Sequence, residues 1–316
     1  MKKTKINRVG IVTNSGKPTS RTVVRRAAAL ISRTGRKVLS DEATAQLAGL
    51  RVETCPGVAA LTRQVDLLVV FGGDGTMLRV AREMNGSRTP VLGINIGGLG
   101  FLTAVPSDDL SVALQHVWKG EYHLESRALI QATARRRDKT IEATALNDVV
   151  ISRGIVSRLI ELEVSVNHEV LTRYRCDGLI VSSPTGSTAY SLAAGGAIVN
   201  PTAEVFTITP ICPHTLSNRS VIVNLDSVIG VTVINPKPET IFSADGQGES
   251  ALQAGDSVTI CRSRHSVQFI RLPGSSFFQT LRHKLHWSGS SIPVRTDLPV
   301  PTAAGAASRF RSVKND

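Results

Sequence analysis

The chain has 316 residues, of which 41% are hydrophobic, so it is long enough to form two domains with a sizeable buried core. No apolar run reaches the roughly 20 residues of a membrane-spanning helix, and the basic start of the chain lacks the apolar segment of a secretory signal. The net charge of +12 fits a basic surface or anionic substrates, and nucleic-acid binding is disfavoured because only 4% of the residues are aromatic.

The first 125 residues predict strands alternating with helices, which is the pattern of an α/β domain. A buried strand at 6–14 precedes a helix with one apolar face, which Gly35 can cap. The alternation continues with a helix at 43–50, a buried strand at 67–70, a helix at 77–84, a buried strand at 90–95 and a helix start at 106–109.

A glycine-rich motif, Phe71-Gly72-Gly73-Asp74-Gly75-Thr76, connects one of these buried strands to the helix after it. Open α/β sheets bind ligands at such strand ends, and glycine N–H groups suit phosphate oxygens, although a simple tight corner is the alternative. Because Asp74 would repel phosphates, it suggests metal binding or acceptance of a proton. The motif recurs in NAD kinases, in lipid kinases and, as a near variant, in phosphofructokinases, so it indicates phosphoryl transfer and leaves the acceptor open.

A second glycine-rich turn, Ile96-Gly97-Gly98-Leu99-Gly100-Phe101, follows the strand at 90–95. Two such turns at strand ends of one small domain could face each other across a cleft.

From Ser126 onward strands dominate, and the second half predicts an all-β domain, a sandwich, over 126–272. Predicted strands lie at 160–166, 178–182, 205–209, 221–224, 228–234, 258–261 and 267–272. A short amphipathic helix is expected within 273–288, and the composition of 289–316 predicts disorder.

The second half contains three further candidate motifs: Asn147-Asp148, the small and hydroxyl-rich stretch from Asp177 to Gly196, and Asp245-Gly246-Gln247. Small residues let a ligand approach the backbone, and hydroxyl groups can hold sugar and phosphate oxygens. A tight loop and a type I′ or type I turn are the structural alternatives for the last two.

Together, and in this order, the motifs resemble the NAD kinase family in its bacterial form. The resemblance covers about 8–287, and the stretch from Asp177 to Gly196 separates this family from lipid kinases and phosphofructokinases. The matching segments are Gly72–Thr76, Asn95–Leu102, Asn147–Asp148, Asp177–Gly196, Cys212–Arg219 and Asp245–Gln247. The resemblance implies an α/β domain at 1–125, a β-sandwich-like NAD-binding domain at 126–272, and a helix at 273–288 that returns to the first domain.

The resemblance also implies a reaction: transfer of the terminal phosphoryl group of ATP or polyphosphate to the 2′-hydroxyl of the adenosine ribose of NAD, giving NADP, with Asp74 as proton acceptor. It implies a divalent metal, Mg²⁺, and a homo-oligomer, a dimer or tetramer. Gly97-Gly98 departs from the larger or charged residues of many members, which leaves the donor preference open. The implied NAD contacts are Asp74, Gly75, Asn147, Asp148, Arg175, Asp177, Thr188, Ala189, Tyr190, Ser191, Leu192, Ala193 and Gln247, and more weakly Arg79 and Arg158, which could each be surface arginines.

Two other functions remain open on the sequence. A lipid kinase would share the Asp74 motif and ignore NAD, and a non-enzymatic dinucleotide-binding regulator would keep the pocket without turnover. Four widely spaced cysteines without metal-ligand spacing predict free thiols in a cytoplasmic protein.

Overall fold

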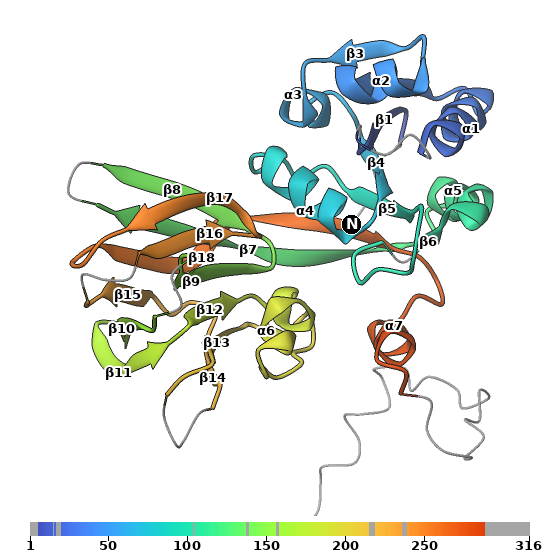
Figure 1. Ribbon diagram of the computed structural model, residues 1–316. Coiled ribbons are helices and arrows are strands. Elements are labelled where there is room, and N and C mark those ends of the chain that lie inside the picture. Colours follow the sequence, from blue (N-terminus) through green and yellow to red (C-terminus); the bar gives the residue numbers. More distant parts are fainter. Residues whose placement is uncertain are drawn as a thin grey trace, which may run out of the picture.

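The computed structural model describes residues 6–14, 16, 20–103, 105–136, 139–155, 158–214, 219–235 and 239–287 (Figure 1). The disorder predicted for 289–316 concerns a segment outside the described residues, and so does part of the Cys212–Arg219 motif.

The first half is an α/β unit built on a parallel sheet, as the strand–helix alternation predicts. Its strands lie in the order β3-β2-β1-β4-β5, and every neighbouring pair in this order is parallel. The strands are β1 (Arg8–Thr13), β2 (Lys37–Asp41), β3 (Glu53–Cys55), β4 (Leu67–Gly72), β5 (Val91–Asn95) and β6 (Val105–Pro106). The helices are α1 (Ser20–Arg33), α2 (Glu42–Ala48), α3 (Val58–Thr62), α4 (Asp74–Glu83), η1 (Ser107–Asp109) and α5 (Leu110–Lys119).

The helices of this unit pack on the sheet through the apolar faces seen in the sequence. On α1 the buried side chains include Val24, Ala27 and Ile31, and on α4 they include Met77 and Val80. All six residues of β4 are buried, as expected for a parallel strand covered on both faces.

The second half is a β-sandwich, which confirms the predicted fold class. One sheet has the order β14-β13-β12-β9-β16-β17, and the facing layer contains β11-β10-β15-β18 together with β7 and β8. The core between the layers includes Leu162 and Ile260 from one layer and Ile151 and Val181 from the other. The strands are β7 (His123–Arg135), β8 (Thr140–Ala145), β9 (Asp148–Arg153), β10 (Ile160–Val166), β11 (Glu169–Cys176), β12 (Gly178–Ser182), β13 (Val205–Ile211), β14 (Val221–Asn224), β15 (Ile229–Val233), β16 (Thr240–Ala244), β17 (Gln247–Leu252) and β18 (Ser257–Arg271). Short helices η2 (Gly186–Thr188) and α6 (Tyr190–Ala193) follow β12.

One strand, β18, belongs to both halves. The sequence predicts two strands here, at 258–261 and 267–272, whereas the structure has one strand of 15 residues whose pairing with β7 is irregular between Arg262 and Ser266. Near its end β18 also pairs in parallel with β5, through Phe269 and Val91. The sandwich layer and the parallel sheet are therefore one 12-stranded sheet.

The last described helix, α7 (Phe277–Lys284), lies beside the second glycine-rich turn. The ring centroids of Phe277 and Phe101 are 6.0 Å apart.

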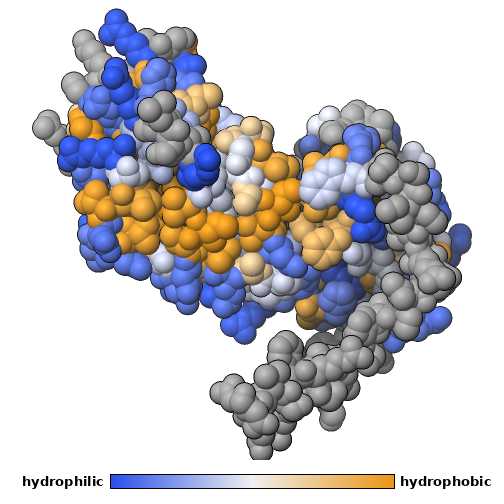
Figure 2. Space-filling view, turned by 90° about the horizontal axis from the view of Figure 1, so that it is seen from below, coloured by the Kyte–Doolittle hydropathy of each residue, from blue (hydrophilic) through white to orange (hydrophobic). Residues whose placement is uncertain are grey.

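An apolar band runs along the β-rich half on the face seen in Figure 2. Large hydrophobic residues on the outer strands of both layers are exposed, among them Val170 (58%) and Leu171 on β11 and Ile222 (52%) on β14. None of the helices in the described part of the chain combines the length and the apolar character needed to cross a bilayer.

Candidate active site

The parallel sheet reverses its strand order between β1 and β4, and ligands bind beyond the carboxyl ends of strands at such a reversal. A pocket of about 240 Å³ opens there. It is lined by the ends of β1, β4 and β5 and the residues after them: Thr13, Asn14, Ser20, Phe71, Gly72, Gly73, Asn95, Ile96, Gly97 and Gly98. Both glycine-rich turns therefore border one pocket, as the sequence suggests.

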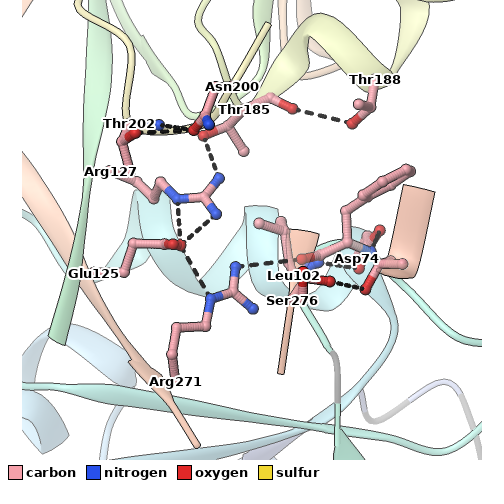
Figure 3. Close-up of polar contacts among 12 residues, drawn as sticks. Asp74, Leu102, Glu125, Arg127, Thr185, Thr188, Asn200, Thr202, Arg271 and Ser276 are labelled. Atoms are coloured by element: carbon pink, nitrogen blue, oxygen red, sulfur yellow. Dashed lines mark hydrogen bonds and ion pairs between the residues drawn. The ribbon is translucent and has the colours of Figure 1, made fainter. Parts of the chain in front are cut away.

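Asp74 is the first residue of α4, and only Gly73 separates it from the end of β4. Its carboxylate accepts backbone hydrogen bonds from the second glycine-rich turn: Phe101 N donates to Oδ2 (2.9 Å) and Leu102 N to Oδ1 (3.0 Å). Figure 3 shows the carboxylate aimed at this turn. A carboxylate has about four acceptor positions, so the two backbone contacts fix its orientation and leave capacity for a further donor such as a hydroxyl group.

The second turn is shaped by a buried amide. Asn95 Nδ2 donates to Gly98 O (2.8 Å) and to Thr103 Oγ1 (2.8 Å), and Asn95 Oδ1 accepts from Gly97 N (2.6 Å). Position 100 has room only for glycine, because a Cβ there would lie 2.1 Å from Asp74 Oδ1.

Three motifs of the second half meet around the start of β9. The buried carboxylate of Asp245 accepts hydrogen bonds from the backbone N–H groups of Leu146 (2.9 Å), Asn147 (2.8 Å) and Asp148 (3.3 Å). On the other side, Ser183 N donates to Asn147 O (2.8 Å), and Gly186 packs so closely on Asn147 that a Cβ would lie 2.1 Å from its carbonyl oxygen.

Asp148 is a buried acid in this cluster, with 5% of its surface exposed. Burial, and then the nearby Asp245 carboxylate, raise the pKa of Asp148 to about 7. Burial also raises the pKa of Asp245, but its three backbone donors and Arg82 oppose that rise, so Asp148 is the acid of this pair that we expect to hold a proton.

Helix α4 connects Asp74 to this cluster. Arg82, near the end of the helix, donates through Nη2 to Gln247 Oε1 (2.7 Å) and lies 3.4 Å from Asp245 Oδ2. The turn at Asp245 and Gly246 has positive φ at both residues (50° and 66°), as in a type I′ turn. The Asp74 helix, Asn147-Asp148, residues 183–186 of the Asp177–Gly196 motif and Asp245–Gln247 are thus joined by direct contacts.

The other predicted contacts divide into two groups. Gly75 is exposed in the first turn of α4, and Arg79 donates from α4 to Thr13 O (3.1 Å) beside the pocket. Thr188 and Ala189 are half-buried after the loop at 183–187, and α6 follows with Tyr190 exposed, Ser191 buried, Leu192 half-buried and Ala193 exposed.

Arg158, Arg175 and Asp177 form the second group, away from the loop at 183–187. Asp177 pairs with Arg153 (2.7 Å), Arg175 is exposed on β11, and Arg158 is exposed before β10. Asp177 and Ser183 lie at opposite ends of the five-residue strand β12, which spans roughly 17 Å at about 3.3 Å per residue. Within one chain the structure does not bring these three residues to Asp74, and their NAD contact stays a prediction.

Several residues of the site were not predicted from the sequence as site residues. Phe101 and Leu102 hold Asp74 through backbone N–H groups, which any residue type supplies, so side-chain chemistry carries no signal. Asp245 lies in a motif that the sequence marks, but its contacts with residues almost 100 positions earlier depend on the tertiary fold.

A metal-binding cage of three or more His, Cys, Asp or Glu side chains is not found among the described residues. Mg²⁺ usually keeps waters and binds through one or two carboxylates together with substrate phosphates, and Asp74 offers one such carboxylate. Asp74 is the carboxylate at the strand end, beside the pocket between the glycine-rich turns.

Comparison with known proteins identifies the family. The ATP-NAD kinase N-terminal domain model matches residues 9–122, and the C-terminal domain model matches residues 146–272. The chain belongs to the ATP-NAD kinase family. It is 42% identical over 276 residues to an NAD kinase of Symbiobacterium thermophilum, covering 87% of this chain and 97% of that protein. It is 41% identical over 289 residues to an NAD kinase of Moorella thermoacetica, covering 90% and 91%.

Solved structures of NAD kinases have the same fold. Yeast NADH kinase in complex with NADH superposes with a TM-score of 0.83 at 26% identity, covering 92% of this chain and 90% of that chain. An NAD kinase from Archaeoglobus fulgidus in complex with ATP gives a TM-score of 0.70 at 26% identity, covering 89% and 100%. The predicted family and its two-part architecture are therefore confirmed.

Proposed function

We propose that this protein is an NAD kinase that transfers the terminal phosphoryl group of ATP or polyphosphate to the 2′-hydroxyl of the adenosine ribose of NAD. The main observation behind this proposal is the Asp74 carboxylate, which the second glycine-rich turn holds in place. It lies where the parallel sheet reverses its strand order and both glycine-rich turns meet. The curated relatives named NAD kinase and the structures solved with NADH and with ATP support both substrates.

In the proposed reaction the 2′-hydroxyl oxygen attacks the terminal phosphorus of the donor. A new P–O bond forms, the bond to the bridging oxygen breaks, and the shortened donor leaves with its electron pair. Asp74 takes the hydroxyl proton, which keeps charge from building up on the attacking oxygen. Mg²⁺, held by donor phosphate oxygens with Asp74 as the nearby carboxylate, would neutralise phosphate charge.

Positioning supplies the rest of the catalysis, because phosphoryl transfer needs little covalent work from a protein. We assign the donor phosphates to the pocket between the glycine-rich turns, where backbone N–H groups suit phosphate oxygens. NAD is assigned to the residues around Asp74, Gly75, Asn147 and Asp148, with the loop and helix at 183–193 beside the adenosine. Arg79, Arg158, Arg175, Asp177 and Gln247 complete the proposed contacts.

We further propose that the protein works as a cytoplasmic homo-oligomer, a dimer or tetramer, without a membrane or nucleic-acid partner. The exposed apolar side chains on the outer strands β11 and β14 support self-association, because such edges tend to be covered by a partner.

The test is an assay of the purified chain with NAD, ATP or polyphosphate, and Mg²⁺, in which NADP is detected by an NADP-specific dehydrogenase. Wild-type protein should form NADP. In Asp74→Asn, kcat should fall by about 10²–10⁴-fold, the usual contribution of a general base, whereas NAD affinity measured by calorimetry should change little.

Asp108→Asn is the matched control, because Asp108 is an exposed carboxylate at the start of η1 and should leave kcat unchanged. Wild-type turnover in Asp74→Asn would exclude the proton-acceptor role. A wild-type protein that phosphorylates diacylglycerol and not NAD would instead favour the lipid-kinase alternative, and NAD binding without any turnover would favour the regulator.

A further inference from the structure

Three charged side chains lie on one face of the ribbon formed by β7 and β18. Glu125 and Arg127 are two positions apart on β7, so they point to the same side. Arg271 on β18 pairs with His123, two positions before Glu125, and therefore shares that side. Glu125 accepts hydrogen bonds from Arg127 Nε (2.8 Å) and Arg271 Nε (3.0 Å), and Figure 3 shows the carboxylate between the two guanidinium groups.

In this Arg127–Glu125–Arg271 group Arg127 is buried and the other two side chains are partly buried. Arg127 has only 3% of its surface exposed. Burial acts to raise the pKa of Glu125, but the two guanidinium groups outweigh it and hold that pKa below its usual value. Movement of Glu125 away from Arg127 is costly, because it would leave the buried guanidinium charge of Arg127 unpaired.

Each end of the group contacts a different part of the candidate site. Arg127 Nη1 donates to Thr185 Oγ1 (3.0 Å), in the loop that packs on Asn147. Arg271 Nη2 donates to Phe101 O (3.4 Å), and Phe101 N in turn donates to Asp74. A continuous polar path thus runs from the Asp74 carboxylate to the loop at 183–188.

Thr185 is buried, and this contact ties its side chain to the ribbon formed by β7 and β18. A cavity of about 510 Å³ lies there, lined in part by Pro184, Thr185 and Thr202. The hydrogen bond from Arg127 restrains the loop on the side of this cavity, and the hydrogen bonds of Ser183 to the start of β9 restrain its other side.

We propose that Arg127, Glu125 and Arg271 are positioning residues that set the distance between the Asp74 carboxylate and the ribose of bound NAD. The proposal rests on the proposed NAD kinase activity, and it deepens it by adding residues that act through Thr185 and Phe101. The group acts by holding the loop at 183–188 and the turn around Phe101 at a fixed separation.

The test uses two substitutions that keep the buried charges in place. Thr185→Val removes only the hydroxyl, and Arg271→Lys keeps the positive charge beside Glu125 and loses the planar fork that reaches Phe101 O. A hydrogen bond to a charged group is worth enough to lower kcat/KM by roughly tenfold in each variant. For Thr185→Val part of this loss should be in kcat, because a displaced loop misplaces the ribose relative to Asp74, whereas a loss of binding contacts alone would raise only KM.

The double variant distinguishes a connected group from two local defects. If the group acts as one unit, Thr185→Val with Arg271→Lys should lose about as much as either single variant, roughly tenfold. Independent defects would multiply to roughly a hundredfold. That multiplicative result, or an unchanged kcat in Thr185→Val, would overturn the proposal. Thr202→Val is the matched control, because Thr202 lines the same cavity and its hydroxyl bonds to Asn200 (2.9 Å) and not to the group.

A second measurement does not depend on activity. Hydrogen–deuterium exchange of the peptide containing Phe101 and Leu102 should be faster in Thr185→Val than in wild type and Thr202→Val, with thermal midpoints compared to monitor folding. If wild-type protein makes no NADP, the proposed function fails, and the exchange result still decides whether the group couples the two segments. Unchanged exchange in Thr185→Val would refute the coupling.

Discussion

At the scale of single residues, Asp148 links protonation to folding. Its side chain is buried beside Asp245, and its pKa of about 7 is far above the ordinary value of 3.8. Between these two values the folded protein binds a proton that the unfolded chain has released. The contribution of Asp148 to the free energy of unfolding therefore decreases as the pH rises from about 4 to about 7, and it is lowest above pH 7.

This decrease of the free energy of unfolding with rising pH can be tested with Asp148→Asn. The amide cannot ionise, so the thermal midpoint of the variant should fall less between pH 5 and pH 8 than that of wild type. The wild-type slope from this single group is at most about 1.4 kcal/mol per pH unit. Calorimetric midpoints across this range measure it. Asp108→Asn should retain the wild-type slope, and equal slopes in wild type and Asp148→Asn would contradict the assignment of the proton.

Sequence reasoning finds residues whose chemistry is visible locally and misses those whose partners are distant. Asp74 stands out because a carboxylate among glycines at a strand end is unusual. The pairing of Asp148 with Asp245 is not predictable in this way, because a strand pairing between β9 and β16 brings the two acids together. Glu125, Arg127 and Arg271 were missed for the same reason: the sequence predicts no strand over Glu125 and Arg127, and the pairing of β7 with β18 brings the three charges together.

At the scale of elements, the second glycine-rich turn fixes the orientation of the first side chain of helix α4, that of Asp74. Its backbone N–H groups hold Asp74, and its Gly100 leaves the space that the carboxylate fills. The sequence predicts both turns and their shared location. It does not predict that the second turn orients the Asp74 side chain of the first. The donors are backbone N–H groups, which every residue type except proline has, so the amino-acid sequence does not reveal them.

Gly100→Ala should therefore damage catalysis more than folding. The added Cβ would meet Asp74 Oδ1 at 2.1 Å, so the carboxylate must move. A misplaced reacting group costs up to roughly 10²-fold in rate, and we expect kcat to fall toward this limit while the far-UV circular dichroism spectrum is retained. Gly57→Ala is the control, because a Cβ there has nothing within 4 Å. Normal kcat in Gly100→Ala would show that the carboxylate does not need its observed position.

The strand β18 shows why element boundaries were only partly predictable. Its two apolar stretches read as separate strands because the segment between them, Arg262 to Ser266, breaks the alternation. In the structure this segment is an irregularity in the ladder with β7, and the strand continues through it. Bulges of this kind interrupt a sequence pattern without ending the strand.

At the scale of the whole molecule, the two halves share one sheet, so they should unfold together. Both tryptophans, Trp118 in α5 and Trp287 after α7, report on the α/β half and its neighbouring helix. In urea, the tryptophan fluorescence transition should coincide with the far-UV circular dichroism transition, which also reports on the sandwich. Two separated transitions would show that the halves fold independently despite the shared strand.

The paired strands β7 and β18 also determine how the molecule can flex around a ligand. No free linker lets the halves swing apart at this connection, since the two strands pair from the sandwich to the end of β18. A change in the angle between the halves must bend the ribbon, and its weakest point is the interrupted pairing between Arg262 and Ser266. Stiffening or loosening that short segment is accordingly the most direct way to alter how readily the angle between the two halves changes.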